Sequence, residues 1–93
     1  MEELKSEETI LVGGRILINN IFTEDEVSKR IKWLIRNSLK KIKSDVSGWF
    51  VLYQDTKDNR YWELSYSNSE LHGGGEPTLT NISEKEFYFR HKV

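Results

Sequence analysis

The chain has 93 residues, with 14 lysines and arginines, 15 aspartates and glutamates, and no cysteine. One domain spanning residues 1–93 is the expectation at this length, and the near balance of charge argues against a globally basic nucleic-acid binder. The lack of cysteine excludes disulfides and thiolate metal sites and indicates a reducing cytoplasm.

The N-terminal segment is polar at first and then apolar. Residues 1–8 lack the apolar run of a signal peptide and are expected to be flexible. TILVGGRILINN, residues 9–20, predicts either two short strands about a tight turn at Gly13-Gly14 or one strand with a bulge there. No apolar run along the chain approaches the roughly 20 residues of a membrane-spanning helix, so no membrane partner is expected.

TEDEVSKRIKWLIRNSLKKIK, residues 23–43, predicts one long amphipathic helix. Thr23 and Glu26 have the spacing of a capping box, and lysines gather near the C-terminal end. A basic stripe is expected opposite the apolar face, made of Lys29, Lys32, Arg36, Lys40 and Lys43. Trp33 lies nearer this stripe, so it is either covered by the N-terminal strands or a loop, or it is an exposed contact beside cations.

SGWFVLYQDTKDNRYWELSYS, residues 47–67, predicts a β-hairpin around TKDN. Pairing residue 55 with residue 60 places the following pairs on the face that packs against the helix: Tyr53 with Trp62, Val51 with Leu64, and Trp49 with Tyr66. The opposite face carries Glu63 among apolar residues. A covered carboxylate needs a partner, which Arg15, Arg90 or a bound protein would supply.

SNSELHGGGEPTL, residues 67–79, is an unusual glycine-rich loop. Phosphate binding is disfavoured because the glycines lead toward a strand and no Lys-Ser or Lys-Thr follows them. His72 with Glu70 has the residue types of an acid–base pair, but one histidine and one carboxylate are weak evidence for catalysis, and a structural role or a partner contact is favoured. His91 lies in a tail expected to fray, so no metal site or cofactor is expected.

The C-terminal region predicts one more strand and one more helix. LTNI, residues 79–82, is expected to form a short edge strand, and Ser83 with Glu86 has capping-box spacing for a short terminal helix. The fold class is therefore α+β, with a small antiparallel sheet packed on one long amphipathic helix and a short C-terminal helix.

Seven segments in this order resemble the Immunity protein 27 family of bacterial polymorphic toxin systems, over residues 9–89. They are LVGGR (11–15), RIKWL (30–34), SGW (47–49), LYQD (52–55), RYWELSY (60–66), SELHGGGEPTL (69–79) and IS (82–83). The chain departs from the family's pattern at Phe50, where an acidic residue is common, and in its lysine-rich helix end.

The resemblance implies a small cytoplasmic protein, made beside a toxin gene, that binds the C-terminal domain of that toxin and neutralises it. The toxin is expected to be a nuclease with a cationic active site, which an acidic surface would cover. The candidate contacts are Asp55, Asp58, Glu63, Glu70, His72 and Glu76. The alternative is that the residues shared across the family hold the fold while variable surface residues choose the toxin.

Two other functions stay open from the residues alone. One is a small nucleic-acid-binding or regulatory domain that uses Trp33 and the basic stripe, which the acidic remainder of the chain disfavours. The other is a small hydrolase that uses His72 with Glu70. The favoured hypothesis is a non-enzymatic toxin inhibitor without a small-molecule substrate.

Overall fold

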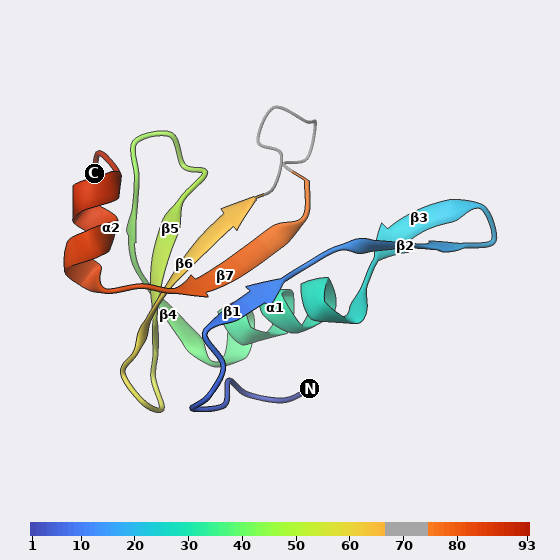
Figure 1. Cartoon of the computed structure of the whole chain (residues 1–93), viewed down its shortest axis with the longest axis horizontal. Helices are drawn as coiled ribbons and strands as arrows, with labels where there is room; N and C mark the ends of the chain where they lie inside the picture. Colours follow the sequence, from blue (N-terminus) through green and yellow to red (C-terminus); the bar gives the residue numbers. More distant parts are fainter. Residues whose placement is uncertain (67–74) are drawn as a thin grey trace.

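The computed structural model describes residues 1–66 and 75–93. Within these ranges a five-stranded antiparallel sheet has the order β1-β7-β6-β5-β4, and β2 and β3 form a separate two-stranded sheet (Figure 1). The elements are β1 Ile10–Val12, β2 Arg15–Ile18, β3 Ile21–Glu24, α1 Glu26–Asn37, β4 Leu39–Ser44, β5 Val51–Asp55, β6 Tyr61–Tyr66, β7 Pro77–Asn81 and α2 Glu84–Arg90. The expected α+β class is confirmed.

The central hairpin β5–β6 has the register that the sequence predicts. Tyr53 is opposite Trp62, Val51 is opposite Leu64, and the Asp55 amide donates to the Arg60 carbonyl at 2.8 Å. Alternating large apolar residues on both sides of a polar turn leave only this register able to bury one complete face.

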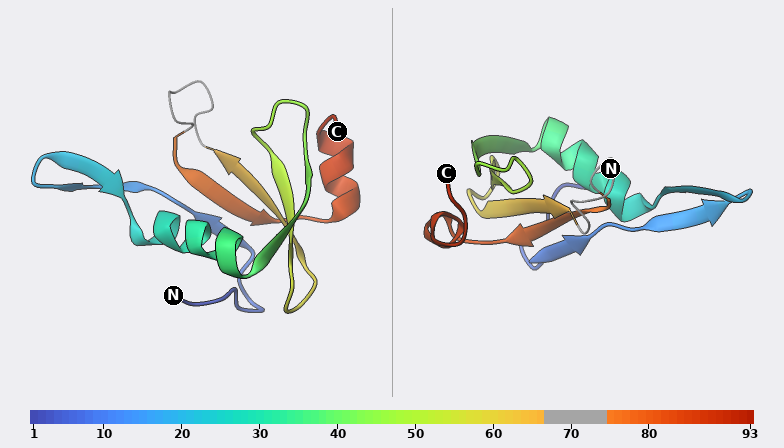
Figure 2. Two further views of the ribbon diagram at one scale, coloured as in Figure 1. Left: turned by 180° about the vertical axis from the view of Figure 1, so that it is seen from behind. Right: turned by 90° about the horizontal axis from the view of Figure 1, so that it is seen from above.

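Apolar side chains cover both faces of the five-stranded sheet. Helix α1 packs on one face, over a core made of Leu4, Leu11, Ile31, Leu34, Leu39, Val51, Tyr53, Trp62, Leu64 and Leu79. Helix α2 packs on the other face, where Phe87 joins Leu52 and Ile82 in a smaller core. The two helices therefore lie on opposite sides of the sheet (Figure 2). The Ser83 hydroxyl accepts the Glu86 amide at 3.0 Å, which confirms the predicted N-terminus of the short helix.

The predicted long helix is wrong at both ends. Its N-cap is Asp25, whose carboxylate accepts the Ser28 amide at 2.8 Å, rather than Thr23. It ends at Asn37, whose side chain bonds the Trp33 carbonyl at 2.8 Å and so competes with the helical backbone. Residues 39–44 then form β4, which pairs with β5. Leucine, isoleucine and lysine suit a helix. Pairing with β5 is more favourable here, because it satisfies the backbone hydrogen-bonding groups along the edge of that strand.

The predicted edge strand is an interior strand. β7 pairs with β6 on one side and with β1 on the other, so β1 and β4 are the edges of the described sheet. The sequence pattern missed this because a short strand of mixed polarity looks the same whether one or two neighbours pair with it.

The Gly13-Gly14 pair is a connection between strands and not the predicted turn or bulge. A Cβ on Gly13 would lie 2.5 Å from Ser28 Oγ and 2.6 Å from the Pro77 carbonyl oxygen, so this crossing requires glycine. The turn lies at Asn19 and Asn20, which have φ of 51° and 63°. Two consecutive positive φ values define the type I′ turn that joins β2 to β3.

The N-terminal segment packs on the sheet and on helix α1. Leu4 is buried in the larger core, and Arg60 donates to the carbonyls of Lys5 and Glu8 at 2.8 and 2.7 Å. The expected flexibility of residues 1–8 stays a prediction, since it concerns motion in solution.

Candidate functional site

The hairpin β2–β3 brings together five of the exposed large apolar residues in the described part of the chain. It projects beyond the edge of the five-stranded sheet (Figure 1), and no third strand pairs with it in the described ranges. Its apolar side chains are between 43 and 69% exposed, namely Ile16, Leu17, Ile18, Ile21 and Phe22. Residues 16–23 carry no charged side chain in a chain that is 31% charged. Apolar surface of this extent marks protein-interaction sites more often than chance.

Fixed contacts hold the base of this hairpin. The Gly13 amide donates to the Pro77 carbonyl at 2.8 Å, and Ser28 Oγ donates to the Gly14 carbonyl at 3.1 Å. On the other strand, the Asp25 amide donates to the Gly14 carbonyl at 3.0 Å. The hydrogen bond from the Ser28 amide lowers the pKa of Asp25 below its ordinary value, which keeps the helix cap ionised. Both strands are thus tied to helix α1 and β7.

Two ion pairs surround the hairpin base. Arg15 Nε lies 2.5 Å from Glu76 Oε1, and Lys32 pairs with Glu24. A pocket of about 300 Å³ opens between these pairs and is lined by Gly14, Arg15, Thr23, Glu24, Ser28, Lys32, Tyr66, Gly75, Glu76 and Pro77. The exposed apolar hairpin therefore has a polar rim containing charges of both signs.

Two of the predicted contact residues are buried. Asp55 is 2% exposed, and its carboxylate accepts the Lys57 amide at 2.8 Å within the β5–β6 turn. Glu63 is 5% exposed, and its Oε2 lies 2.6 Å from His91 Nε2 while Oε1 lies 3.6 Å from Arg90 Nη1. The expected internal partner Arg90 is therefore present. Both carboxylates hold local structure in the free protein.

Asp58 and Glu76, the other predicted contacts that the structure describes, lie at opposite ends of β6. Asp58 lies in the β5–β6 turn, where burial works to raise its pKa but hydrogen bonds from Arg60 outweigh burial and lower it. Glu76 precedes β7, at the opposite end of β6. Glu70 and His72 lie outside the described residues. Among the predicted contacts that the structure describes, Glu76 is the one at the hairpin base.

The predicted basic stripe is divided between two elements. Lys29 and Lys32 lie on α1 and pair with Glu26 and Glu24, whereas Lys40 and Lys43 lie on β4. Trp33 is half-buried and packs against the larger core. The helix therefore does not present a continuous cationic face with an exposed aromatic ring.

His91 is a structural residue that sequence reasoning missed. Its ring stacks on Phe50, with centroids 4.3 Å apart, and contacts Phe87 at 4.8 Å. It bonds the buried carboxylate of Glu63, so it ties the end of α2 to the sheet. The one sequence signal related to this role of His91 is the capping box at Ser83. It predicts the helix whose end brings residue 91 over the sheet.

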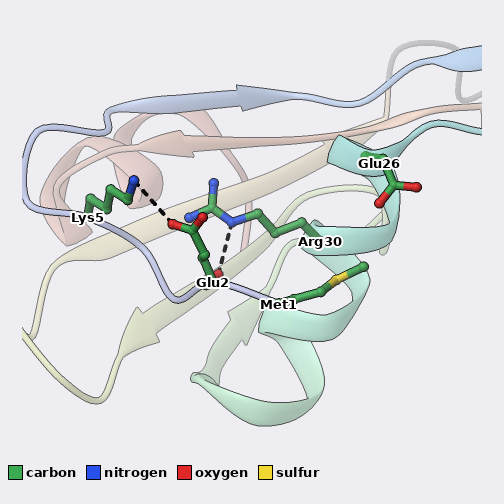
Figure 3. A pocket seen from close by; sticks show the side chains of 5 residues that line it. All are labelled: Met1, Glu2, Lys5, Glu26 and Arg30. Carbon is green, nitrogen blue, oxygen red and sulfur yellow. Dashed lines mark hydrogen bonds and ion pairs between the residues drawn. The ribbon is translucent and has the colours of Figure 1, made fainter.

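A second pocket of about 300 Å³ lies between the N-terminal segment and α1. Figure 3 shows Glu2 between Lys5 and Arg30, with Met1 and Glu26 completing the lining. These side chains include no hydroxyl, thiol or imidazole group. Within the described part of the chain, no group of acidic, histidine or cysteine residues is placed to hold a metal ion, and no helix is long and apolar enough to cross a membrane.

Comparison with known protein families gives a match to part of the chain. The family model of Immunity protein 27 matches residues 17–83, a span that includes the hairpin tip, helix α1 and the whole of β4 to β7. No curated protein and no solved structure matches the chain. The match covers well over half of the sequence and agrees with the resemblance carried by its motifs, so the chain belongs to the Immunity protein 27 family.

Proposed function

We propose that this protein is a non-enzymatic immunity protein that acts in the cytoplasm. It binds the C-terminal domain of a cognate bacterial toxin and neutralises the toxin by covering its active site. The observation that carries the proposal is the family match over residues 17–83.

Two features of the surface support a protein partner. The apolar hairpin β2–β3 exposes large side chains that a protein surface would cover, and its rim carries charges of both signs. The half-buried position of Trp33 and the divided basic stripe give less support to the nucleic-acid alternative.

We further propose that the toxin is a nuclease and that Glu70, His72 and Glu76 contact it, Glu76 from the base of the hairpin, with Asp58 as a more distant contact. Acidic residues suit the cationic active site that a nuclease needs for its substrate. Asp55 and Glu63 act differently in this proposal: their burial and local hydrogen bonds support a role in holding the β5–β6 turn and helix α2.

The direct test mixes the purified protein with the toxin domain encoded beside its gene. We expect a stoichiometric complex on a sizing column and loss of the toxin's activity at a one-to-one ratio. A separate titration with RNA and DNA provides the comparison. Absence of the protein complex together with salt-dependent nucleic-acid binding would contradict the proposal and favour the nucleic-acid function.

A further inference from the structure

We propose, on the basis of the function proposed above, that hairpin β2–β3 inserts into an uncharged, apolar cleft of the toxin domain and supplies most of the binding energy. Phe22 and Ile21 are the anchors, one on each face of the hairpin. The acidic residues beside the hairpin base then form part of the rim.

Both faces of the hairpin are apolar. Cross-strand partners share a face, so Ile16, Ile18 and Ile21 lie together with Thr23, whereas Leu17 and Phe22 lie on the opposite face. An ordinary two-stranded ribbon packed on a protein body would show one apolar and one polar face. A partner that covers the apolar surface of this hairpin must therefore contact it on two sides, as a cleft does.

The charge distribution specifies the chemistry of that cleft. A charged group facing residues 16–23 would be buried without a partner, which is strongly unfavourable. Charges become available only at the base, where Arg15 pairs with Glu76 and Lys32 pairs with Glu24. The complementary surface is thus neutral and apolar inside, with polar groups of both signs at its mouth, in line with the core and rim of known interfaces.

A second copy of this chain fits the hairpin poorly. Packing two hairpins through their isoleucine faces would bury on the order of 200 Å² of apolar surface per copy, by the usual area of such side chains. A stable interface buries about 800 Å² per partner. Such a pair would also leave Leu17 and Phe22 of each copy in water.

The contacts at the base explain why the hairpin is a suitable anchor. Gly13 and Gly14 lie close to Ser28, Asp25 and Pro77. These contacts fix the orientation of the hairpin relative to the rest of the protein. An element that is already held in its bound orientation loses less conformational entropy on binding.

The test compares two phenylalanines with the same substitution. Phe22 is 69% exposed on the hairpin, and Phe89 is 91% exposed on helix α2, so Phe89→Ser is a matched control for Phe22→Ser. Ile21→Thr probes the other hairpin face and keeps a β-branched side chain that suits a strand. The probe is the toxin domain encoded beside the gene, and the readouts are its Kd for each variant and the urea unfolding midpoint of each variant alone.

We expect Phe22→Ser to raise Kd at least thirtyfold, which corresponds to the roughly 2 kcal/mol of a binding hot spot. Ile21→Thr should raise Kd at least fivefold, and Phe89→Ser less than twofold. The three unfolding midpoints should stay near that of the wild type, because all three side chains are exposed. Raising the salt concentration from about 50 to 300 mM should change the wild-type Kd only a fewfold, since the buried contact is neutral.

The outcomes separate this inference from the proposed function. A wild-type complex that both hairpin variants form equally well would overturn the inference and leave the proposed function standing. A complex whose affinity falls steeply with salt would also overturn it, because acidic contacts would then dominate. Failure of the wild type to bind the toxin domain would overturn both. Self-association that Phe22→Ser abolishes would assign the hairpin to a second copy and contradict the inference.

Discussion

At the scale of single residues, two tryptophans with similar places in the sequence pattern have different environments. Trp62 is fully buried in the larger core, whereas Trp49 lies just before β5, is 38% exposed and meets Tyr66 edge-on at 5.9 Å. The expectation that both would be buried against the helix is therefore wrong for Trp49, because β5 begins only at Val51.

We expect Trp62→Ala to lower the free energy of unfolding by about 3–5 kcal/mol, the range for a large aromatic residue removed from a core. Trp49→Ala should cost about 1 kcal/mol, since it loses one aromatic contact at the surface. Urea unfolding followed by circular dichroism measures both. Equal losses for the two variants would show that the face of the sheet has been assigned wrongly.

His91 and Glu63 form the polar contact that holds α2 on the sheet. Among the described residues, removing His91 leaves the buried Glu63 carboxylate with the more distant Arg90 as its ion-pair partner, so His91→Ala should cost about 1–3 kcal/mol at pH 7. Lys92→Ala, at the neighbouring exposed position, is the control and should cost almost nothing.

A double-mutant cycle with Glu63→Gln gives the coupling between the two side chains. The loss caused by His91→Ala should be smaller in the Glu63→Gln background, because a neutral amide is less costly to leave without its partner. Purely additive losses would contradict a direct interaction between His91 and Glu63.

The residue scale also shows what the sequence could reveal. The buried aromatic pairs of β5 and β6 follow from alternation, and Arg90 was a foreseeable partner for Glu63. The pair Asn19-Asn20 between two apolar runs is a hairpin signal. The predicted turn nevertheless lies at Gly13-Gly14, because consecutive glycines are also typical of turns. Gly13 is needed because its backbone lies close to Ser28 and Pro77, and this contact exists only in the folded protein.

At the scale of elements, hydrogen bonds from Arg30 and Arg60 hold the N-terminal segment on the rest of the protein. Arg30 on α1 donates to both oxygens of the Glu8 carboxylate at 2.8 Å and to the carbonyls of Glu2 and Glu3. The hydrogen bonds from Arg30 lower the pKa of Glu8 from 4.5 to about 2. A carboxyl whose pKa is lower in the folded protein stabilises the fold above its unfolded pKa, and loses this effect as the pH falls to its folded pKa.

We therefore expect Glu8→Gln to lower the free energy of unfolding by about 1 kcal/mol at pH 7, the upper part of the range for ion pairs near the surface. The difference from the wild type should shrink between about pH 4.5 and pH 2 and vanish below that interval. Glu7→Gln is the matched control, since the carboxylate of Glu7 bonds only the Ser6 hydroxyl among the described residues. A difference that persists unchanged at pH 2 would contradict the role of the Arg30 pair.

Elements were predictable where local signals agreed with tertiary packing. The central hairpin and the capped C-terminal helix satisfy this condition. Residues 39–44 do not, because their composition suits a helix and only the free edge of β5 turns them into β4. Propensity is a weak determinant there, and a non-local partner decides.

At the scale of the whole molecule, the chain divides into a packed body and a projecting hairpin (Figure 2). The body accounts for almost all buried apolar residues, whereas the hairpin holds five of the exposed large ones. Family membership was predictable because it depends on motifs in order. The candidate site was predictable only in part, since charge in the sequence does not reveal that Asp55 and Glu63 are buried or that Asp58 and Glu76 lie at opposite ends of β6.

The most direct test of this account is amide hydrogen exchange of the protein, free and in complex with the toxin domain. Residues 16–23 belong to a two-stranded hairpin exposed on both faces, so their amides should exchange rapidly in the free protein. We expect the largest gain in protection at these residues, with smaller gains around Glu76. Unchanged exchange at residues 16–23, with protection appearing at β4 or at the β5–β6 turn instead, would contradict the claim that the hairpin is the element that binds the toxin.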